Sequence, residues 1–474
     1  NTGVLNDGAG NIPQWDPNDP NGGADFHGFS AADRFNYNGP GFNFLRTPNE
    51  RINFYANVRH DLAPNITMFA RASYTNRSSE TKGAPEPLCL GNGCGTRITD
   101  NFVIGADNPY NFTGLELSVA NGNLEFFGRR PLESGGRLFF QDVNTYMITA
   151  GLEGEFDAAN RCFYWDLTAG YGDNRGFQEK YHSHNAAKLQ VAMGPLAVCE
   201  ATPGCVPFNF FGGQGPDGNG SITEEMLNFV RYTQRDFSEQ TLKNYAFNIG
   251  GEIADLPGGT MGFAAGLEYR DHEGSFRPDP VAASGDTAGI PSGPTDGGFD
   301  VTEFYGEINV PLVSGAALAD LIEVNAAVRS SDYSTSGSQT TYKVSGLWRP
   351  IEELSFRGSV STGFRAPGIG ELFGGSARED FTFLDPCADY TGIVGSDGGG
   401  RDTPQSADIQ ANCATLGVPV GLAQINPQLS ALSTGNDELE PEESDNVTLG
   451  FVYSPAWSEG MAWSDGMTLS IDYY

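Results

Sequence analysis

The feature that most constrains the fold is an alternation of apolar and polar residues in paired segments along most of the chain. In residues 51–59 the even positions are apolar and the odd positions are mostly polar. The pattern returns in residues 66–75, after a turn at 63–64, with Phe69 as an exception on the polar side. A period of two is typical of a β-strand with one apolar and one polar face. The two segments therefore predict a β-hairpin.

Five further pairs of segments show the same pattern. We expect hairpins at 143–174, 245–269, 302–333, 339–365 and 445–474, with turns at 157–160, at 256–259, near Ser314, at Pro350 and near Pro455. This gives about twelve strands. The links within hairpins are short, whereas most links between hairpins are long. The long links are 78–142, 175–241, 273–301 and 366–444, and the one short exception lies near Ser334.

This sorting of the links indicates the fold class. In a transmembrane barrel the strands run up and down, so short periplasmic turns gather at one rim and long extracellular loops at the other. We therefore predict an all-β protein, part of an antiparallel up-and-down transmembrane β-barrel with long extracellular loops. On the expected strands, Phe54, Val58, Ile148, Leu167, Phe247 and Leu267 should face lipid, and Asn53, Asn57, Arg71, Glu153 and Glu268 should face the lumen.

Composition agrees with this fold class and excludes others. The 474 residues include 63 Gly, 32 Phe and 18 Tyr, as expected for many aromatic strands joined by turns. The formal net charge of -33 argues against a nucleic-acid partner, because phosphate binding needs clustered Lys and Arg. The sequence contains no run of about 20 apolar residues, so it predicts no membrane-spanning helix. One helix is expected, from Ile222 to Tyr232, with a capping box of Ser221 and Glu224.

Six of the seven cysteines fall into pairs that share a long link. The pairs are Cys89 with Cys94, Cys199 with Cys205, and Cys387 with Cys413. Such pairing predicts disulfides in an oxidising compartment, where they would staple loops that have no core of their own. Cys162 is left over at the start of a strand and is expected to be a small buried apolar residue.

Two segments near the C-terminus carry sharper motifs. Residues Ser361–Pro367 read STGFRAP and are followed by Glu371-Leu372-Phe373, and residues 436–443 read NDELEPEE before a strand at 446–450. Together with the loop element ADNPYN at 106–111, they resemble the barrel domain of TonB-dependent outer-membrane receptors. The resemblance spans roughly residues 40–474.

The resemblance implies a 22-stranded barrel closed by an N-terminal plug. We therefore expect residues 1–474 to be a partial barrel domain, without the plug, the TonB-interacting box and about ten strands. The implied function is energised, ligand-gated uptake of a scarce nutrient, such as a siderophore or an oligosaccharide, in the outer membrane of a Gram-negative bacterium. The implied partners are outer-membrane lipid, the ligand, and the TonB complex through the plug. No cofactor is expected.

Five residues are candidates for ligand contact. Arg365 ends a strand at the expected outer rim, where it would meet an anionic ligand or pair with a loop carboxylate. Tyr110, Phe112, Phe210 and Phe211 lie in long loops, where they would stack on a sugar or an aromatic chelate or pack within the loops themselves.

Other functions find less support in the sequence. Residues 216–225 resemble a calcium loop, but the register places Gly215 and Met226 at ligand positions. His182 and His184 would need further ligands to hold a metal, so no metal site is predicted. There is no nucleophile elbow, no GK[ST] loop and no HExxH motif, so an enzyme is not predicted. A passive porin-like channel and a surface adhesin barrel remain the alternatives.

Overall fold

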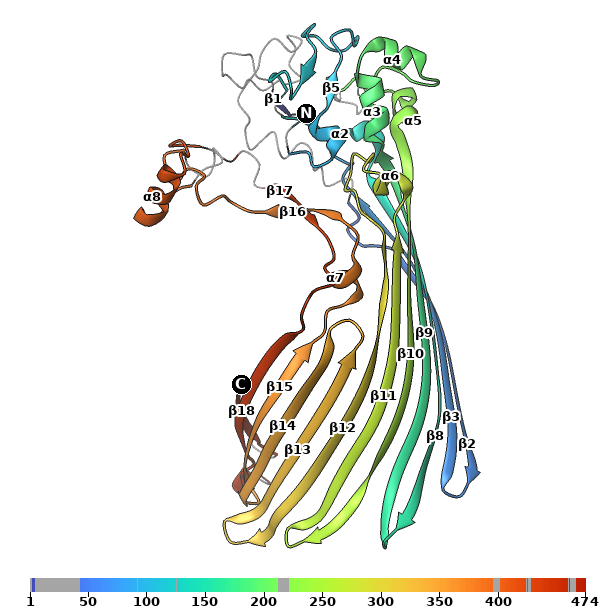
Figure 1. The fold of residues 1–474 in the computed structure, drawn as a ribbon, viewed down its shortest axis with the longest axis vertical. Helices are drawn as coiled ribbons and strands as arrows, with labels where there is room; N and C mark the ends of the chain where they lie inside the picture. Colours follow the sequence, from blue (N-terminus) through green and yellow to red (C-terminus); the bar gives the residue numbers. More distant parts are fainter. Residues whose placement is uncertain are drawn as a thin grey trace.

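The computed structural model describes residues 2–4, 43–91, 93–124, 126–211, 221–394, 401–422, 424, 428–458, 460 and 466–474. Its main element is a 12-stranded antiparallel sheet (Figure 1). The strands of this sheet are β2 (Asn49–Ala63), β3 (Ile66–Gly83), β8 (Arg137–Ala158), β9 (Arg161–His184), β10 (Arg231–Leu256), β11 (Gly259–Arg277), β12 (Thr295–Ala316), β13 (Ala319–Tyr333), β14 (Gly337–Ile351), β15 (Leu354–Arg365), β18 (Glu442–Tyr453) and β19 (Leu469–Tyr473).

The strands of the sheet follow chain order from β2 to β19, so the topology is up-and-down. The remaining elements lie in the links between strands. They are β1 (Thr2–Val4), β4 (Leu88–Gly91), α2 (Arg97–Asp100), β5 (Val103–Ile104), β6 (Leu117–Ser118), β7 (Phe126–Arg129), η1 (Leu132–Ser134), α3 (Ala186–Met193), α4 (Leu196–Ala201), α5 (Glu224–Val230), α6 (Pro280–Ala283), α7 (Ile369–Phe373), β16 (Ala377–Thr382), α8 (Ala407–Thr415), β17 (Gln428–Ser433) and η3 (Ala456–Ser458). Among the described residues, no helix is long and apolar enough to span a membrane.

The strand register places the predicted apolar and polar residues on opposite faces. Phe247 pairs with Leu167 on one side and with Leu267 on the other, so the three side chains share one face. Asn57 pairs with Arg71 on the opposite face. All six residues predicted to face lipid are between 40% and 64% exposed. A continuous apolar face of this extent needs an apolar partner, and a bilayer supplies one.

Two rows of aromatic rings mark the limits of the apolar face. The lower row includes stacked Phe156 and Phe163, with ring centroids 5.3 Å apart, and stacked Trp348 and Phe356, also 5.3 Å apart. The upper row is made of tyrosines. Its pairs are Tyr74 with Tyr146, at 4.9 Å, and Tyr245 with Tyr269, at 6.4 Å.

The spacing of the two rows fits a membrane. On β11 the upper ring of Tyr269 follows the lower ring of Phe263 by six residues. At about 3.3 Å per residue this is roughly 20 Å along the strand, close to the apolar band of about 25 Å in transmembrane barrels. Because β10 has 26 residues, it extends well past the upper row. The tops of β8–β11 therefore project beyond the band and carry the loops (Figure 1).

Glycines explain why some aromatic rings lie on the polar face. Phe69, the exception in the sequence pattern, lies across Gly151, where an added Cβ would come within 2.6 Å of the ring. Tyr305 lies in the same way across Gly266 and donates a hydrogen bond from its hydroxyl to Asn248 Oδ1, at 2.8 Å. Each ring fills the space that a missing side chain leaves on the neighbouring strand.

Several sequence-based boundaries were wrong. The helix expected at 222–232 is α5, and its N-cap is Thr223 rather than Ser221, because the Thr223 side chain accepts from Met226 N. Tyr232 already belongs to β10. Further helices, α3 and α8 among them, were not expected.

Three turns also differ from the expectation. The β12–β13 hairpin closes between Ala316 and Ala319, and the β14–β15 hairpin closes between Ile351 and Leu354, each a few residues after the predicted turn. The link after β18 runs from 454 to 468, so it is longer than the turn expected near Pro455. Residues 216–220 of the calcium-like segment lie outside the described residues.

Candidate functional site

Four long loops leave the same rim of the sheet. We number them in chain order: loop 1 (84–136), loop 2 (185–230), loop 3 (278–294) and loop 4 (366–441). The β13–β14 link of three residues is the short exception that the sequence indicated. Loops 1 to 3 gather above β8–β11, whereas loop 4 projects away as an arm that ends in α8 (Figure 1).

The three predicted cysteine pairs form disulfides, and each lies within one loop. Cys89–Cys94 is in loop 1, Cys199–Cys205 is in loop 2, and Cys387–Cys413 is in loop 4. Loop 4 is also held to loop 1, because the Arg378 guanidinium donates to the carbonyl of Cys94.

Loops 1 and 2 share one apolar core. We call it the loop core; its residues are Leu88, Leu90, Phe102, Ile104, Leu117, Leu124, Phe127, Ala186, Leu189, Ala192, Met193, Phe208, Phe210, Phe211, Ile222, Met226, Leu227, Val230 and, from loop 3, Ala288. It is the core of a small folded unit that stands on the ends of the strands. On the wall, in contrast, many large apolar residues are exposed, as a membrane wall requires.

Polar side chains fix the position of loop 1 relative to loop 2. Gln190 of α3 accepts from Val103 N at 3.0 Å and donates to Val103 O at 2.7 Å. Its side-chain amide thus makes the two backbone hydrogen bonds that a neighbouring strand would make with β5. Asn108 of the ADNPYN element donates to Ala192 O, at 3.3 Å. Both contacts satisfy backbone groups that would otherwise be buried without partners.

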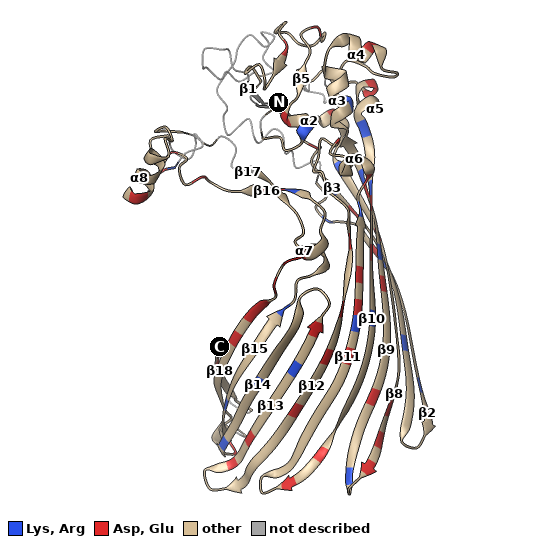
Figure 2. Ribbon diagram, viewed as in Figure 1, with Lys and Arg blue, Asp and Glu red and all other residues tan. Residues whose placement is uncertain are grey.

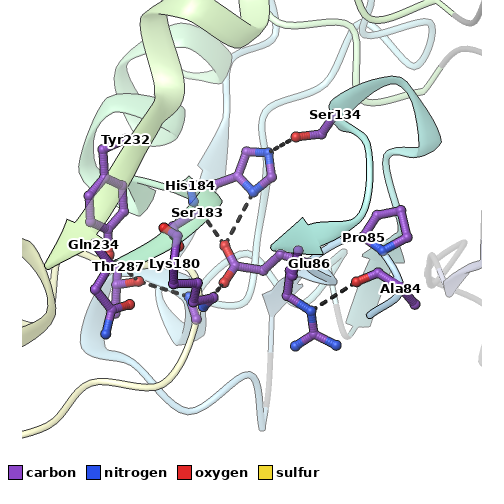
Figure 3. A network of polar contacts seen from close by, with 12 residues as sticks. Ala84, Pro85, Glu86, Ser134, Lys180, Ser183, His184, Tyr232, Gln234 and Thr287 are labelled. Carbon is purple, nitrogen blue, oxygen red and sulfur yellow. Dashed lines mark hydrogen bonds and ion pairs between the residues drawn. The ribbon is translucent and has the colours of Figure 1, made fainter. Parts of the chain in front are cut away.

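A buried polar cluster joins this unit to the strand ends. We call it the Glu86 clamp; its members are Glu86, Ser134, Lys180 and His184. One carboxylate oxygen of Glu86 pairs with Lys180 Nζ, and the other accepts from His184 N at 2.8 Å and lies 3.2 Å from His184 Nδ1. His184 Nε2 lies 3.0 Å from Ser134 Oγ (Figure 3). Glu86 and Ser134 belong to loop 1, and Lys180 and His184 belong to β9.

The clamp is a charged site inside the protein. Glu86 is 1% exposed and His184 is 0% exposed. Burial alone would raise the pKa of the Glu86 carboxyl, but the hydrogen bond from His184 and the Lys180 ammonium outweigh it and lower that pKa to about 2.

The order of groups in the clamp matches the Ser-His-carboxylate connectivity of hydrolases. However, Ser134 is only 2% exposed and the carboxylate also pairs with Lys180, so a substrate has no access to the hydroxyl. The arrangement is structural. It also accounts for His184, which the sequence offered as a metal ligand, since both ring nitrogens already have partners. His182 Nδ1 donates to Gly136 O at 2.8 Å.

The family motif around Arg365 forms a second anchor. Arg365, the last residue of β15, pairs with Glu442 of β18 at 2.6 Å and with Glu371 of α7 at 2.8 Å. Glu371 also accepts from Gly368 N at 2.7 Å, and thus stabilises the start of its own helix. Of the two kinds of partner that the sequence allowed, the structure shows carboxylates, one from loop 4 and one from the first residue of β18. An anionic ligand at Arg365 remains a prediction and would have to displace one of them.

The aromatic candidates divide into buried and exposed residues. Phe210 and Phe211 are 0% and 3% exposed in the loop core, so they present no ring face to a ligand in this arrangement. Phe112 is 50% exposed and packs edge-on against Phe211, with centroids 5.5 Å apart. Tyr110 is partly buried against the loop core. Stacking on a ligand thus remains a prediction that Phe112 suits best.

The polar face of the sheet carries its own charge cluster, which the sequence pattern did not reveal. Glu303 of β12 is 3% exposed and pairs with Arg329 at 2.6 Å and with Arg270 at 2.7 Å. Arg329 also pairs with Glu268 at 2.9 Å. Figure 2 shows acidic and basic residues distributed along these strands. Such charges on a membrane wall belong on the side away from lipid. Among the described residues, no group of three or more His, Cys, Asp or Glu side chains is placed to hold a metal.

Comparison with known families identifies this architecture. The family model described as "TonB dependent receptor-like, beta-barrel" matches residues 92–474. This chain belongs to the TonB-dependent receptor family. The match includes the STGFRAP and ADNPYN segments, loop 1 from residue 92 onward, loops 2 to 4 and ten strands of the 12-stranded sheet. No curated protein matches the chain.

Solved structures show likeness in fold at low sequence identity. The siderophore receptor PirA of Acinetobacter baumannii is 13% identical, with a TM-score of 0.42, over 90% of this chain and 43% of PirA. The ferric enterobactin receptor PfeA of Pseudomonas aeruginosa is 12% identical, with a TM-score of 0.38, over 87% of this chain and 41% of PfeA. The RagAB peptide transporter is 10% identical, with a TM-score of 0.38, over 86% of this chain and 38% of the RagAB chain. The chain thus spans less than half the length of these structures.

Proposed function

We propose that this chain is the ligand-capturing part of an outer-membrane receptor that imports a scarce nutrient with energy from the TonB system. The observation that carries the proposal is the family match over residues 92–474. The family's members are receptors and transporters, which points away from an enzyme. In this proposal a plug and further strands, supplied by the full-length protein, complete the barrel and gate the path.

The loops support capture rather than free passage. Loops 1 and 2 share a core, and disulfides and the Glu86 clamp restrict them further. Preorganised loops lose little conformational entropy when a ligand binds, so they favour high affinity. A passive channel that only sorts solutes by size has no need of a folded unit of this kind at its rim.

The class of ligand is proposed only broadly. A siderophore, an oligosaccharide or a peptide would all suit loops with an exposed aromatic ring, Phe112, and a rim arginine, Arg365. PirA and PfeA are siderophore receptors, and RagAB is a peptide transporter. We propose that Phe112 contacts the ligand directly and that Phe210 and Phe211 support it from within the loop core.

Uptake in whole cells tests this function. Cells that produce the full-length protein would be given radiolabelled ferric siderophores, oligosaccharides and peptides, each over a range of concentrations, with and without an uncoupler. We expect uptake of one class to saturate at low concentration and to stop when the proton gradient collapses. Uptake that rises in proportion to concentration and ignores the uncoupler would instead support a passive porin-like channel. Surface attachment without uptake of any probe would support an adhesin.

A further inference from the structure

Two kinds of contact hold the loops in place, and they act at different positions. Apolar contacts in the loop core join loop 1 to loop 2. Polar contacts join this pair to the tops of the strands, and the Glu86 clamp is at their centre. The same region adds Arg137 Nε, which donates to Ala84 O at 2.9 Å, and Arg130, which donates to Pro85 O at 3.0 Å. The backbone just before Glu86 is thus held in place as well.

Loop 3 closes over the clamp. Ala288 N donates to His184 O at 2.8 Å, and Tyr232 of β10 donates to Thr287 Oγ1 at 3.0 Å (Figure 3). Gly289 leaves no room for a side chain, because an added Cβ would lie 2.7 Å from Glu86 Oε1. Loops 1 and 3 and the end of β9 therefore meet at one buried carboxylate, and loop 2 begins directly after the clamp residue His184.

We propose that Glu86 is the release point of a single loop unit made of loops 1, 2 and 3. While the clamp is intact, the unit is fixed on the strand ends. When the carboxylate loses its partners, the three loops detach from the strand ends together, while the membrane wall stays folded.

The chemistry of the carboxylate explains why one residue has this effect. Its two oxygens meet an ammonium, a backbone N–H and an imidazole nitrogen. Removing it leaves the Lys180 ammonium buried without its counter-charge and leaves His184 N without an acceptor. A buried unpaired charge is costly, and water can satisfy these groups only if the loops move apart. A glutamine is a poor substitute, because its NH₂ group would face a donor.

Hydrogen–deuterium exchange of the full-length protein in detergent micelles tests the inference. The variant is Glu86→Ala, and the matched control is Glu116→Ala, an exposed glutamate of the same loop. We expect exchange to become at least about tenfold faster in α3 of loop 2 and in residues 286–289 of loop 3, although neither segment contains the substitution. Exchange in β13 and β14 should not change, and the control should match the wild type.

A second variant keeps the test decisive if Glu86→Ala fails to fold. Gly289→Ala preserves every charge and presses one methyl group against Glu86, whereas Gly83→Ala adds a methyl where nothing lies within 4 Å. We expect Gly289→Ala to give the same pattern with a smaller effect, and Gly83→Ala to give none. Faster exchange confined to residues 84–90, or exchange in Gly289→Ala equal to that of Gly83→Ala, would overturn the proposal. This readout does not depend on uptake, so it can fail or succeed independently of the proposed function.

Discussion

At the scale of single residues, the buried Glu86 carboxylate makes the loops sensitive to acid. Its pKa is lowered from the usual 4.5 to about 2, so it stabilises the fold fully above pH 4.5 and loses this effect as the pH falls toward 2. The lowered pKa corresponds to a contribution of roughly 3 kcal/mol to the free energy of unfolding near neutral pH. The titratable groups that contact it are Lys180 and His184, and Asp236 and Asp279 lie near the neighbouring Tyr232.

We therefore expect the loops to stay closed from pH 8 to about 5, since Glu86 remains ionised there, and to loosen between pH 4.5 and 2. Limited proteolysis with pepsin, which is active in acid, would follow cleavage within residues 84–136 and 185–230. In Glu86→Gln the loops should be cleaved faster already at pH 4.5, and the dependence on pH should be weaker. An identical profile for the variant and the wild type would contradict this role of the carboxylate.

Also at this scale, neighbouring residues of β10 should respond in opposite ways to the same substitution. Phe247 is on the apolar face, and Ala246 is on the polar face, paired with Glu268. An arginine at mid-depth on the lipid side costs about 2–4 kcal/mol, so Phe247→Arg should lower the free energy of unfolding by that amount. Ala246→Arg should have little effect, because its guanidinium can reach water and Glu268. Urea titration of the folded barrel in lipid vesicles measures both. Equal losses would mean that the two faces are wrongly assigned.

The facing of these residues could be predicted from the sequence, but the Glu86 clamp could not. The alternation of apolar and polar residues involves only neighbours along the chain, so a single segment such as 51–59 is enough to reveal it. The partners of Glu86 are 94 and 98 residues away along the chain, and no periodicity links positions so distant. Glu86 lies in a stretch, APEPL, that reads as an ordinary loop.

At the scale of elements, α7 shows why the motif around Arg365 is constructed as it is. The helix packs on a directly paired glycine couple, Gly274 of β11 and Gly297 of β12. A Cβ at Gly297 would overlap the Phe373 ring, and Ile369 lies over Gly274. Because the two glycines have no side chains, α7 can pack directly on the sheet at this position. Arg365 holds the helix there through its ion pair with Glu371.

Two glycines of the same strand provide a matched test. Gly297→Ala should displace α7, whereas Gly306→Ala adds a methyl where nothing lies within 4 Å. We expect the former to destabilise the root of loop 4 by about 1–3 kcal/mol, as for overpacking in a core, and the latter to be neutral. Exchange of the amides in residues 369–373 reports the difference. Slow exchange in Gly297→Ala, equal to that of Gly306→Ala, would show that α7 does not need a glycine beneath it.

Helices and turns were harder to predict than strands. The α3 helix starts one residue after Asn185, its N-cap, which itself follows β9 directly. The strand pattern therefore runs into the helix with no loop to separate them. In the β12–β13 hairpin the register shifts between Pro311 and Val313 and the pairing continues past Ser314 to Ala316, so the alternation in the sequence did not mark where the strand ends.

At the scale of the whole molecule, the order of short and long links was the most informative signal. It correctly predicted the up-and-down sheet of 12 strands and placed all three disulfides in loops at one rim. The shared core of loops 1 and 2 was not predicted, because its residues come from two links separated by the β8–β9 hairpin. Some of them have helical spacing, such as Ala186, Leu189 and Met193 of α3, but this spacing does not show which loop the helix packs against.

We propose that this chain forms a membrane wall whose long loops lie outside the cell. Labelling with a membrane-impermeant maleimide tests this orientation in variants of the full-length protein that carry one introduced free thiol, with Cys162→Ser as background. Leu115→Cys and Leu416→Cys lie in exposed parts of loops 1 and 4, and Asn160→Cys and Leu318→Cys lie in exposed hairpin turns at the opposite rim. We predict that the loop positions react in intact cells and that the turns react only after the outer membrane is permeabilised. Reaction of the turns in intact cells, with the loops protected, would contradict the orientation and the account built on it.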